Sequence, residues 1–386
     1  MDFFHIKRIA PPLKASLNRN IFIIAPKKVG KTSYLKDVEV DLYLDLQDSD
    51  TFRKLTFQKN IIQTILPFNA KTIAIDNIHL LPSLLEQIQT IHTQQNIHFI
   101  LTATHCGFFN KILKQYPKLN FKLIELLPFC YPELREHFNL DEIIKYGSLP
   151  HLLNKDNKEF LLSNYVGLLF QEDLVPNAKI RKIENFSRFL NTAALYNGLP
   201  ISYEEIAKRC DVPSRTVREY FRYLKDLNIV HEIKSTSISS KNKSTVNSKF
   251  YFFDIGFCNA LSDSFPNKSD YEKYEQNLKH YLLLELLAYK IHRKPDLKIE
   301  FWSNYTGDKI DFIINNEYAL EVRATSNINF NHTYTLERFI KKHPLKRHLL
   351  ITLDKTTKLD INNKSPAIEL SYIETFVKDL WREKYF

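Results

Sequence analysis

The segment at residues 20–33, NIFIIAPKKVGKTS, constrains the fold of this chain more than any other stretch. It joins a short apolar run at 20–25 to a basic loop and then to a helical pattern that begins near Lys31. A buried strand that leads through a loop into a helix N-terminus is the setting in which backbone N–H groups converge on a phosphate. We therefore expect an α/β domain with a phosphate-binding loop.

The loop matches the spacing of the phosphate-loop motif, except that Ala25 replaces its first glycine. In such a loop Lys31 reaches the β and γ phosphates, and Thr32 ligates Mg²⁺. The candidate nucleotide-binding residues of the loop are Ala25, Pro26, Lys27, Lys28, Val29, Gly30, Lys31, Thr32 and Ser33. The implied cofactors are ATP and Mg²⁺. The competing interpretation is an ordinary α/β domain whose loop matches the motif by chance.

Further apolar segments predict the rest of this domain. The segments 41–48, 71–81 and 98–104 have the pattern of strands, and residues 84–92 that of a helix. Strands that alternate with helices indicate a parallel sheet. The segment IAID ends at Asp76, at the carboxyl edge of the sheet, where the carboxylate would hold Mg²⁺ together with Thr32.

Composition excludes several classes of protein. Of the 386 residues, 44% are hydrophobic and 25% charged, as in ordinary soluble globular proteins and unlike disordered chains. No apolar run has the length of a membrane span, the N-terminus has no apolar signal region, and the four cysteines form no CxxC pair. We therefore expect a cytoplasmic protein without structural zinc. The net charge of +10 permits nucleic-acid binding without requiring it.

Residues 202–226 have the pattern of a helix-turn-helix. Ser202 and Glu205 have the spacing of a capping box, and an apolar stripe on the second helix is formed by Val217, Phe221 and Leu224. The other side of that helix carries Arg215, Arg218, Arg222 and Lys225. The polar stretch 235–249 would form the wing of a winged helix; it contains no acid and carries Lys241, Lys243 and Lys249.

The winged helix has two interpretations. In the first, the second helix lies in the major groove of double-stranded DNA and the wing contacts phosphates. The DNA-binding residues would then be Arg215, Arg218, Arg222, Lys225, Lys241 and Lys243. In the second, the module packs against protein, and its charged face is simply solvated.

The last third of the chain predicts a second α/β domain. Polar residues at 262–270 mark a boundary, a long helix covers 271–292, and strands follow at KIEFW, KIDFII, EYALEVRA and RHLLITL. We therefore expect three parts: a P-loop domain at 1–140, a helical segment with the winged helix at 141–261, and an α/β domain at 262–386.

This arrangement resembles a group of prokaryotic AAA-type ATPases. In that group a winged helix and a C-terminal domain similar to the PD-(D/E)xK nucleases, a restriction-endonuclease-like α/β fold, follow the P-loop domain. Beside the helix-turn-helix, the resemblance is carried by APKKVGKT (25–32), IAIDNIHLLPSLL (73–85), FILTAT (99–104), IELLPFCYPEL (124–134), YGSLPHLL (146–153), KFYFFDIG (249–256) and FWSNYTGDKIDFI…LEVRA (301–324). It covers nearly the whole chain.

The resemblance also identifies functional residues that this chain has replaced. Asn77 stands where the relatives carry a glutamate that activates water, and Asn120 stands where they carry a candidate arginine finger. Thr102 or Thr104 would serve as the polar sensor residue. Because asparagine cannot accept a proton at neutral pH and an arginine finger contributes roughly 10³-fold or more to turnover, we assign no catalytic residue and expect ATP binding with slow or absent hydrolysis.

In the nuclease-like domain, the resemblance places Asp311, Glu321 and Arg323 at the positions of two metal-binding acids and the catalytic lysine. Glu285 should approach the same face from the helix, whereas Lys279 stands where the family has its first glutamate. Arginine cannot be deprotonated, and its fork differs in geometry from an ammonium group. We therefore expect a catalytically inactive remnant without tight Mg²⁺ binding.

The hairpin formed by KIDFII and EYALEVRA allows a geometric prediction. A two-residue loop would put Asp311 and Glu321 on opposite faces of the sheet. A three-residue loop at 315–317 would pair Ile314 with Tyr318 and put both carboxylates on one face. Asparagine tolerates the left-handed backbone that either loop needs. We predict the three-residue loop, since a shared face is what an ancestral metal site requires.

The combined expectation is an ATP-binding AAA-like protein with slow or absent hydrolysis, coupled to double-stranded DNA or to a protein partner. One alternative is a non-enzymatic DNA-binding or scaffold protein with a vestigial P-loop. A weaker alternative is a DNA-cleaving enzyme. No membrane partner is expected, and the sequence does not define an oligomeric state.

Overall fold

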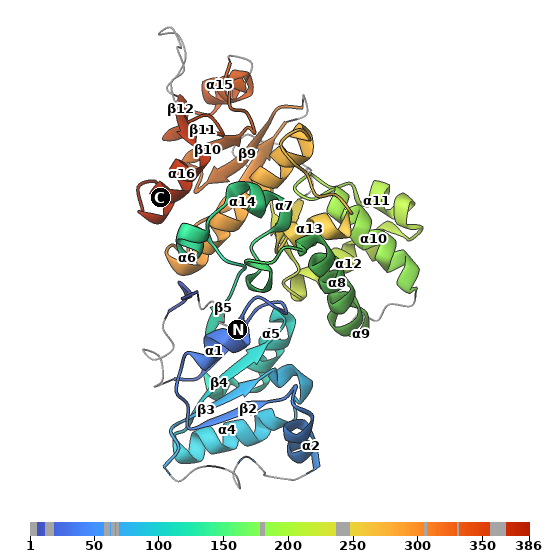
Figure 1. Cartoon of the computed structure of the whole chain (residues 1–386), viewed down its shortest axis with the longest axis vertical. Helices are drawn as coiled ribbons and strands as arrows, with labels where there is room; N and C mark the ends of the chain where they lie inside the picture. Colours follow the sequence, from blue (N-terminus) through green and yellow to red (C-terminus); the bar gives the residue numbers. More distant parts are fainter. Residues whose placement is uncertain are drawn as a thin grey trace. The chain divides into compact units, whose positions relative to one another are not determined.

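A computed structural model describes residues 6–11, 19–57, 62, 66, 69–177, 182–236, 248–304, 307–329, 332–355 and 368–386 (Figure 1). The chain forms two compact units. The first contains Met1–Phe129, Leu149–His151 and Tyr223–Ile229, and the second contains Cys130–Ser148, Leu152–Arg222 and Val230–Phe386. None of the helices in the described ranges combines the length and the apolarity needed to cross a membrane.

The first unit is built on a parallel sheet of five strands. These are β1 (Ile21–Ile24), β2 (Leu42–Asp45), β3 (Thr72–Asp76), β4 (His98–Ala103) and β5 (Lys122–Glu125), in the order β2-β3-β4-β1-β5. Every neighbouring pair is parallel, which confirms the predicted sheet and adds β5 to it. All four residues of β1 are buried, because a central parallel strand is covered on both faces.

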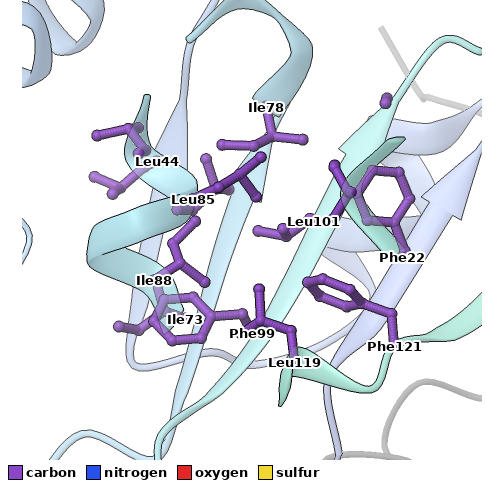
Figure 2. Close-up of a cluster of buried hydrophobic side chains, with 14 of the residues drawn as sticks. Phe22, Leu44, Ile73, Ile78, Leu85, Ile88, Phe99, Leu101, Leu119 and Phe121 are labelled. Atoms are coloured by element: carbon purple, nitrogen blue, oxygen red, sulfur yellow. The ribbon is translucent and has the colours of Figure 1, made fainter. Parts of the chain in front are cut away.

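Helices and short turns connect these strands. They are α1 (Lys31–Lys36), α2 (Ser49–Phe57), η2 (Ile78–Leu80), α4 (Leu84–Gln95), α5 (Cys106–Gln115) and η3 (Pro117–Leu119). Figure 2 shows how Leu85 and Ile88 of α4 pack against Ile73 and Phe99 of the sheet. Phe121 joins the same core, with its ring centroid 5.4 Å from that of Phe22. This core fixes the strands whose carboxyl ends carry the site described below.

The second unit begins with a helical region. Its helices are α6 (Tyr131–Leu134), η4 (Arg135–His137), α7 (Leu140–Tyr146), η5 (Pro150–Leu152), α8 (Lys158–Leu169), a π-helical turn η6 (Phe170–Leu174), α9 (Val175–Asn177), α10 (Ile183–Leu195), α11 (Tyr203–Cys210), α12 (Ser214–Asp226) and α13 (Ile255–Leu261). The η5 turn and the α12 helix each contribute residues to both units.

The pair α11 and α12 occupies the predicted helix-turn-helix segment and leads into an antiparallel pair, β6 (Val230–Ile233) and β7 (Lys249–Phe252). Val217, Phe221 and Leu224 are buried, as the apolar stripe predicts. The Ser202 hydroxyl accepts a hydrogen bond from the Glu205 N–H at 3.2 Å. The Glu205 carboxylate accepts from Tyr196 and Arg209 in place of the reciprocal capping-box bond.

Of the predicted wing at 235–249, the structure describes residues 235–236 and 248–249. Lys241 and Lys243 lie outside the described residues. Lys249, where the predicted wing ends and the strand KFYFFD was expected to begin, is the first residue of β7 and only 3% exposed, so it lies in the strand rather than on the surface of a wing.

The C-terminal part of the second unit is a five-stranded mixed sheet in the order β12-β11-β10-β9-β8. Its strands are β8 (Ile299–Ser303), β9 (Lys309–Ile314), β10 (Tyr318–Val322), β11 (Arg347–Thr352) and β12 (Ile368–Tyr372). The accompanying helices are α14 (Tyr271–His292), α15 (Tyr334–Lys342) and α16 (Ile373–Trp381) (Figure 1). The long helix predicted at 271–292 is therefore confirmed.

The turn between β9 and β10 has the predicted three-residue form. Tyr318 pairs with Ile314, and the antiparallel register continues along both strands. Asn315 and Asn316 have φ values of 52° and 58°, the left-handed backbone that asparagine tolerates better than most residues. One further step of this register places Asp311 opposite Glu321 on a single face.

A buried histidine of α14 holds the second unit together through both ring nitrogens. His280 Nε2–H donates to the Phe252 carbonyl at 2.6 Å, and Nδ1 accepts from the Asn197 side-chain amide at 3.1 Å. Burial lowers the pKa of His280 to about 3, although the bond to the Phe252 carbonyl acts the other way. The folded state therefore holds a neutral imidazole.

We predict that His280→Gln reduces the acid sensitivity of the second unit. A folded-state pKa below the unfolded value means that stability is fully present above about pH 6.5 and is lost as the pH falls toward 3. The loss from His280 between pH 7 and pH 4 should be about 3 kcal/mol, and the glutamine variant should lack it. Urea unfolding followed by tryptophan emission measures this unit, since both tryptophans, Trp302 and Trp381, belong to it.

The matched control is His332→Gln, a histidine whose ring lies in the loop before α15. This control separates the loss of the His280 imidazole from the general effect of replacing a histidine by glutamine. An unchanged pH dependence in His280→Gln would show that the His280 imidazole is not held neutral by the fold.

Candidate nucleotide-binding site

The loop between β1 and α1 has the backbone of a phosphate-binding loop. Lys28 has a φ of 62° and Gly30 a φ of 105°, so the loop turns through two left-handed residues before α1 begins at Lys31. Ala25 is fully buried and is not among the residues of positive φ. Its methyl group therefore imposes no backbone strain, which explains why alanine can replace the first glycine of the motif.

Lys31 is directed back over this loop. Its ammonium donates to the carbonyl oxygens of Ala25 at 2.6 Å and Pro26 at 3.0 Å, and the side chain is 7% exposed. The loop carbonyls thus accept the hydrogen bonds of the ammonium group that phosphate oxygens would accept in a nucleotide complex.

Asp76 is the centre of a hydrogen-bond network at the carboxyl edge of the sheet. The Thr32 hydroxyl donates to its Oδ2 at 2.7 Å, and the Tyr43 hydroxyl donates to the same oxygen at 3.2 Å. Thr102 donates to the other oxygen, Oδ1. A hydroxyl and a carboxylate are ligands that suit Mg²⁺, so the structure brings together the two residues that the sequence assigned to it.

The backbone at position 77, directly after β3, has a conformation that suits asparagine. Its φ is 63°, and its N–H donates to the Thr102 hydroxyl at 2.9 Å. A glutamate in this left-handed conformation would be strained, since asparagine is among the few residues that adopt it readily. The residue is also buried, so this position does not offer a base to an attacking water.

Asn120 lies away from the loop. It precedes β5 and is exposed at the amino end of that strand, whereas the phosphate loop follows the carboxyl end of β1. In a parallel sheet these ends lie at opposite edges. Asn120 therefore does not face the phosphate loop of its own chain.

Two polar side chains that follow β3 and β4 each have a buried atom without a hydrogen-bond partner in the described part of the chain. Thr104 is 4% exposed, and its hydroxyl has no hydrogen-bond partner, nor has Nδ1 of His79. The ring of His79 lies 5.9 Å from that of His105, which caps α5 by accepting from the Phe108 N–H at 3.3 Å.

The positive charge of Lys31 helps to lower the pKa of both imidazoles. Burial, His105 and Lys31 lower the pKa of His79 to about 3, and burial, Lys111 and Lys31 lower the pKa of His105 to about 4. Two neutral histidines thus lie near the phosphate loop. The sequence reasoning missed them, although their position directly after two parallel strands was a usable signal, because ligands bind at the carboxyl ends of such strands.

The site fits a nucleotide phosphate with Mg²⁺. The fit rests on the hydroxyl of Thr104, which has no hydrogen-bond partner among the described residues, on the Lys31 ammonium group above the loop carbonyls, and on the Thr32–Asp76 pair. These groups could hold anionic phosphate and a hard cation. They include no base within the network around Asp76.

A second candidate site lies in the C-terminal sheet, where acids and cations alternate. Lys279 Nζ lies 2.9 Å from Glu275 Oε1 and 3.4 Å from Asp311 Oδ1. Arg323 pairs with Glu275 at 3.1 Å and also with Glu321. Backbone N–H groups of Val322 and Ala324 complete the bonds of Asp311 and Glu275.

The cations of this cluster occupy the space between its carboxylates. Burial acts to raise the pKa of Asp311, but the charges of Lys279 and Lys249 hold it below its usual value. Burial raises the pKa of Glu321 to about 7 against the guanidinium of Arg323. In the described ranges, no group of three or more His, Cys, Asp or Glu side chains is arranged to hold a metal ion.

The prediction for Glu285 is wrong. Its carboxylate accepts from the Tyr131 N–H at 2.8 Å and from the Trp381 indole at 2.7 Å, away from Asp311 and Glu321. Glu275 takes its place in the cluster. Glu275 lies one helical turn before Lys279 on α14, so the (i, i+4) spacing of an acid and a base was the signal for it.

The basic face of α12 is only partly available. Arg215 is 88% exposed and pairs with Glu219 at 3.3 Å. Arg218 stacks on the ring of Tyr203 and pairs with Glu204 at 3.4 Å. Arg222 and Lys225 are exposed.

Comparison with known proteins identifies two segments. Residues 17–135 match the family model of an AAA domain, and residues 137–268 match a model described as a domain of unknown function (DUF8612). No curated protein matches the sequence. The first unit therefore carries an AAA domain of the P-loop class, in agreement with its sheet and its loop.

Two solved structures are similar to parts of the chain. Hsp104 of S. cerevisiae, in a complex with ADP, is 13% identical with a TM-score of 0.26, and the match covers 53% of this chain and 36% of that chain. Can2 from Sulfobacillus thermosulfidooxidans, in complex with cyclic tetra-adenylate, is 12% identical with a TM-score of 0.22, and the match covers 89% of this chain and 96% of that chain. This chain thus spans about a third of the length of the Hsp104 chain.

We predict that Lys279→Met destabilises the second unit by about 3 kcal/mol, because it leaves Glu275 and Asp311 buried with one cation fewer. Urea unfolding followed by tryptophan emission measures the change. The control is Lys290→Met, on the last turn of the same helix, which should change the free energy of unfolding by less than about 0.5 kcal/mol.

A double-mutant cycle tests the origin of this loss. Combining Lys279→Met with Asp311→Asn should cost less than the sum of the two single changes, because the pair shares one ionic contact. Strict additivity would show that Lys279 acts through packing rather than through charge.

Proposed function

We propose that the AAA domain binds ATP with Mg²⁺ at the loop 25–33 and Asp76, that hydrolysis is slow, and that the bound nucleotide controls the second unit. The observation that supports this most directly is the Thr32–Asp76 hydrogen bond of 2.7 Å beside an ammonium group held over the loop carbonyls. The AAA-domain match of residues 17–135 supports the same ligand class.

Each residue has a role in this proposal. N–H groups of the loop and the Lys31 ammonium would bind the phosphates, and Thr32 and Asp76 would hold Mg²⁺. When bound, the ion would neutralise charge on the phosphates. Thr102 already hydrogen-bonds to Asp76, so Thr104, whose hydroxyl has no partner among the described residues, is the better candidate for the polar sensor.

Slow hydrolysis follows from two positions. Asn77 cannot accept a proton from water, and its left-handed backbone does not suit a glutamate. Asn120 brings no positive charge, and it lies at the other edge of the sheet. The loop would therefore bind ATP without hydrolysing it rapidly.

We predict that Lys31→Ala lowers the affinity for Mg·ATP by roughly 100-fold, since each charge-assisted hydrogen bond to phosphate contributes about 1.5–3 kcal/mol. Isothermal titration calorimetry of the full chain, with and without Mg²⁺, measures this. The matched control is Lys36→Ala, an exposed lysine at the last turn of α1, which should bind like the parent chain.

Two results would contradict the proposal. Absence of ATP binding by the parent chain would support a vestigial loop in a non-enzymatic scaffold. Turnover by the parent chain at about 1 s⁻¹ or faster would contradict slow hydrolysis.

We propose that double-stranded DNA is a partner of this chain and that it binds through the helix-turn-helix at 202–226. The specific observation in favour is the exposure of Arg215, Arg222 and Lys225 along one helix. Arg218 contributes less to this surface, because Tyr203 and Glu204 already engage its guanidinium. A protein partner on the same face is the rival interpretation.

We predict that Arg215→Ala combined with Arg222→Ala weakens duplex binding and reduces the slope of log affinity against log salt by about 2, one for each lost phosphate contact. Fluorescence anisotropy of a labelled duplex at several salt concentrations measures both. The control pair, Lys341→Ala with Lys342→Ala on α15, removes the same charge and should leave the salt slope unchanged. Equal affinity of the two double variants would assign this helix to protein packing.

We propose that the C-terminal sheet is the inactive remnant of a nuclease-like domain. The shared face of Asp311 and Glu321 agrees with it, and Glu275 completes a set of three acids. Lys279 and Arg323 bind these acids from within the chain. We therefore propose that this sheet serves binding rather than cleavage.

A further inference from the structure

A cavity of about 450 Å³ opens beside the C-terminal ion cluster. Three segments of the second unit form its walls: residues 198–200, the start of β7, and the first turns of α14. Lys309 and Asp311 of β9 complete it. Its volume lies in the range of small-molecule sites, which is about 300–1,000 Å³.

Lys249 is the unusual residue of this cavity. The alternation of β7 directs Phe250 and Phe252 to one face and Lys249 and Tyr251 to the other. Phe250 stacks on Phe221 of α12 with 4.2 Å between the ring centroids, whereas Lys249 and Tyr251 line the cavity. The alternation thus places a basic and a phenolic side chain together on the cavity wall.

The position of Lys249 is fixed by the backbone on both sides. It pairs with Ile233 in β6 and forms an isolated bridge with Pro200. Gly198, with a φ of 75°, lies so close to Tyr251 that an added Cβ would come within 2.6 Å of its ring. The glycine therefore allows the cavity wall to close around the strand.

Lys249 carries a buried charge that the carboxylate of Asp311 offsets only from a distance, without an ion pair. It is 3% exposed, and within the described residues no hydrogen bond or ion pair reaches its Nζ; its recorded contact is the face of Phe301, 4.6 Å from the ring centroid. A buried ammonium group without a partner costs several kcal/mol, which a cation–π contact offsets only in part. Burial lowers the pKa of Lys249 to about 8, so the ammonium form still predominates at neutral pH.

The neighbouring acids are already engaged. Asp311 binds Lys279 and the Val322 N–H, and Glu275 binds Lys279, Arg323 and the Ala324 N–H. Lys249 is the buried cation of this cavity, and Lys273 and Lys309 add two more positive charges to its lining, so the cavity can take a negatively charged ligand. The volume of about 450 Å³ suits a small ligand with one phosphate better than a nucleic-acid strand.

We propose that this cavity is a second ligand site, which binds the phosphate group of a small phosphate ester on Lys249. The side chain supplies a buried positive charge, and the Tyr251 hydroxyl lies on the same wall. The exposed ring of Tyr271 at the opening offers a flat surface for an organic substituent. The proposal does not depend on nucleotide binding at residues 25–33.

The test uses the full chain carrying Lys31→Ala, so that the phosphate loop does not contribute. Calorimetric titration with inorganic phosphate and with adenosine 5′-monophosphate should show binding of both. Lys249→Met should weaken both by roughly 10- to 100-fold, the effect of losing a charged hydrogen-bond partner. Lys249→Gln provides a second neutral variant, and Lys341→Met on α15 is the matched control that should bind like the parent.

Stability without ligand separates a binding role from a structural one. The desolvation of this buried ammonium exceeds its long-range attraction to Asp311, since burial lowers its pKa, so Lys249→Met should melt at the same or a higher temperature in a thermal scan followed by tryptophan emission. A lower melting temperature in both neutral variants would show that Lys249 serves to neutralise Asp311, which would overturn the proposal.

Two binding results would overturn it as well. One is the absence of binding of phosphate and of adenosine 5′-monophosphate, or binding that the Lys249 variants leave unchanged. The other is displacement of adenosine 5′-monophosphate by a duplex oligonucleotide, which would assign the cavity to a polymer.

Discussion

The carboxylate of Asp76 is the contact on which the order of the AAA domain depends. It accepts hydrogen bonds from the loop helix through Thr32, from β2 through Tyr43 and from β4 through Thr102. A buried acid with three hydroxyl donors is fully satisfied only when these three segments end at the same level of the sheet. The network therefore sets the height of the phosphate loop against the strands, and an incoming cation would meet an oxygen that is already oriented.

Local patterns predicted most of the fold because local forces decide it. The apolar runs of β1, β3 and β4 and the helix at 271–292 are visible in sequence, since both faces of a central strand are buried and a long helix repeats its own period. The Asn315–Asn316 turn could be predicted for the same reason, because its register depends on a few residues of known backbone preference.

The features that the sequence did not reveal are long-range. Glu275 rather than Glu285 joins the ion cluster, and which face of a helix meets a given strand depends on packing that no local pattern records. Lys249 ends a polar stretch whose composition is typical of exposed residues, yet strand pairing with Ile233 places it inside. His79 and His105 become neighbours only when β3 and β4 align.

The bonds of Glu285 have a consequence for the order in which the chain folds during synthesis. This buried carboxylate joins Tyr131, the second residue of the second unit, to Trp381, across sequence separations of 154 and 96 residues. Contacts of such length form late, because the loops between them must close first. The bond of Tyr131 therefore waits until α14 has been made, and the bond of Trp381 waits for the last helix to leave the ribosome, whereas the parallel sheet of the AAA domain is complete once β5 has been made. A chain that is cut before Trp381 would keep the sheet of the nucleotide-binding domain and would leave the carboxylate of Glu285 without its indole partner.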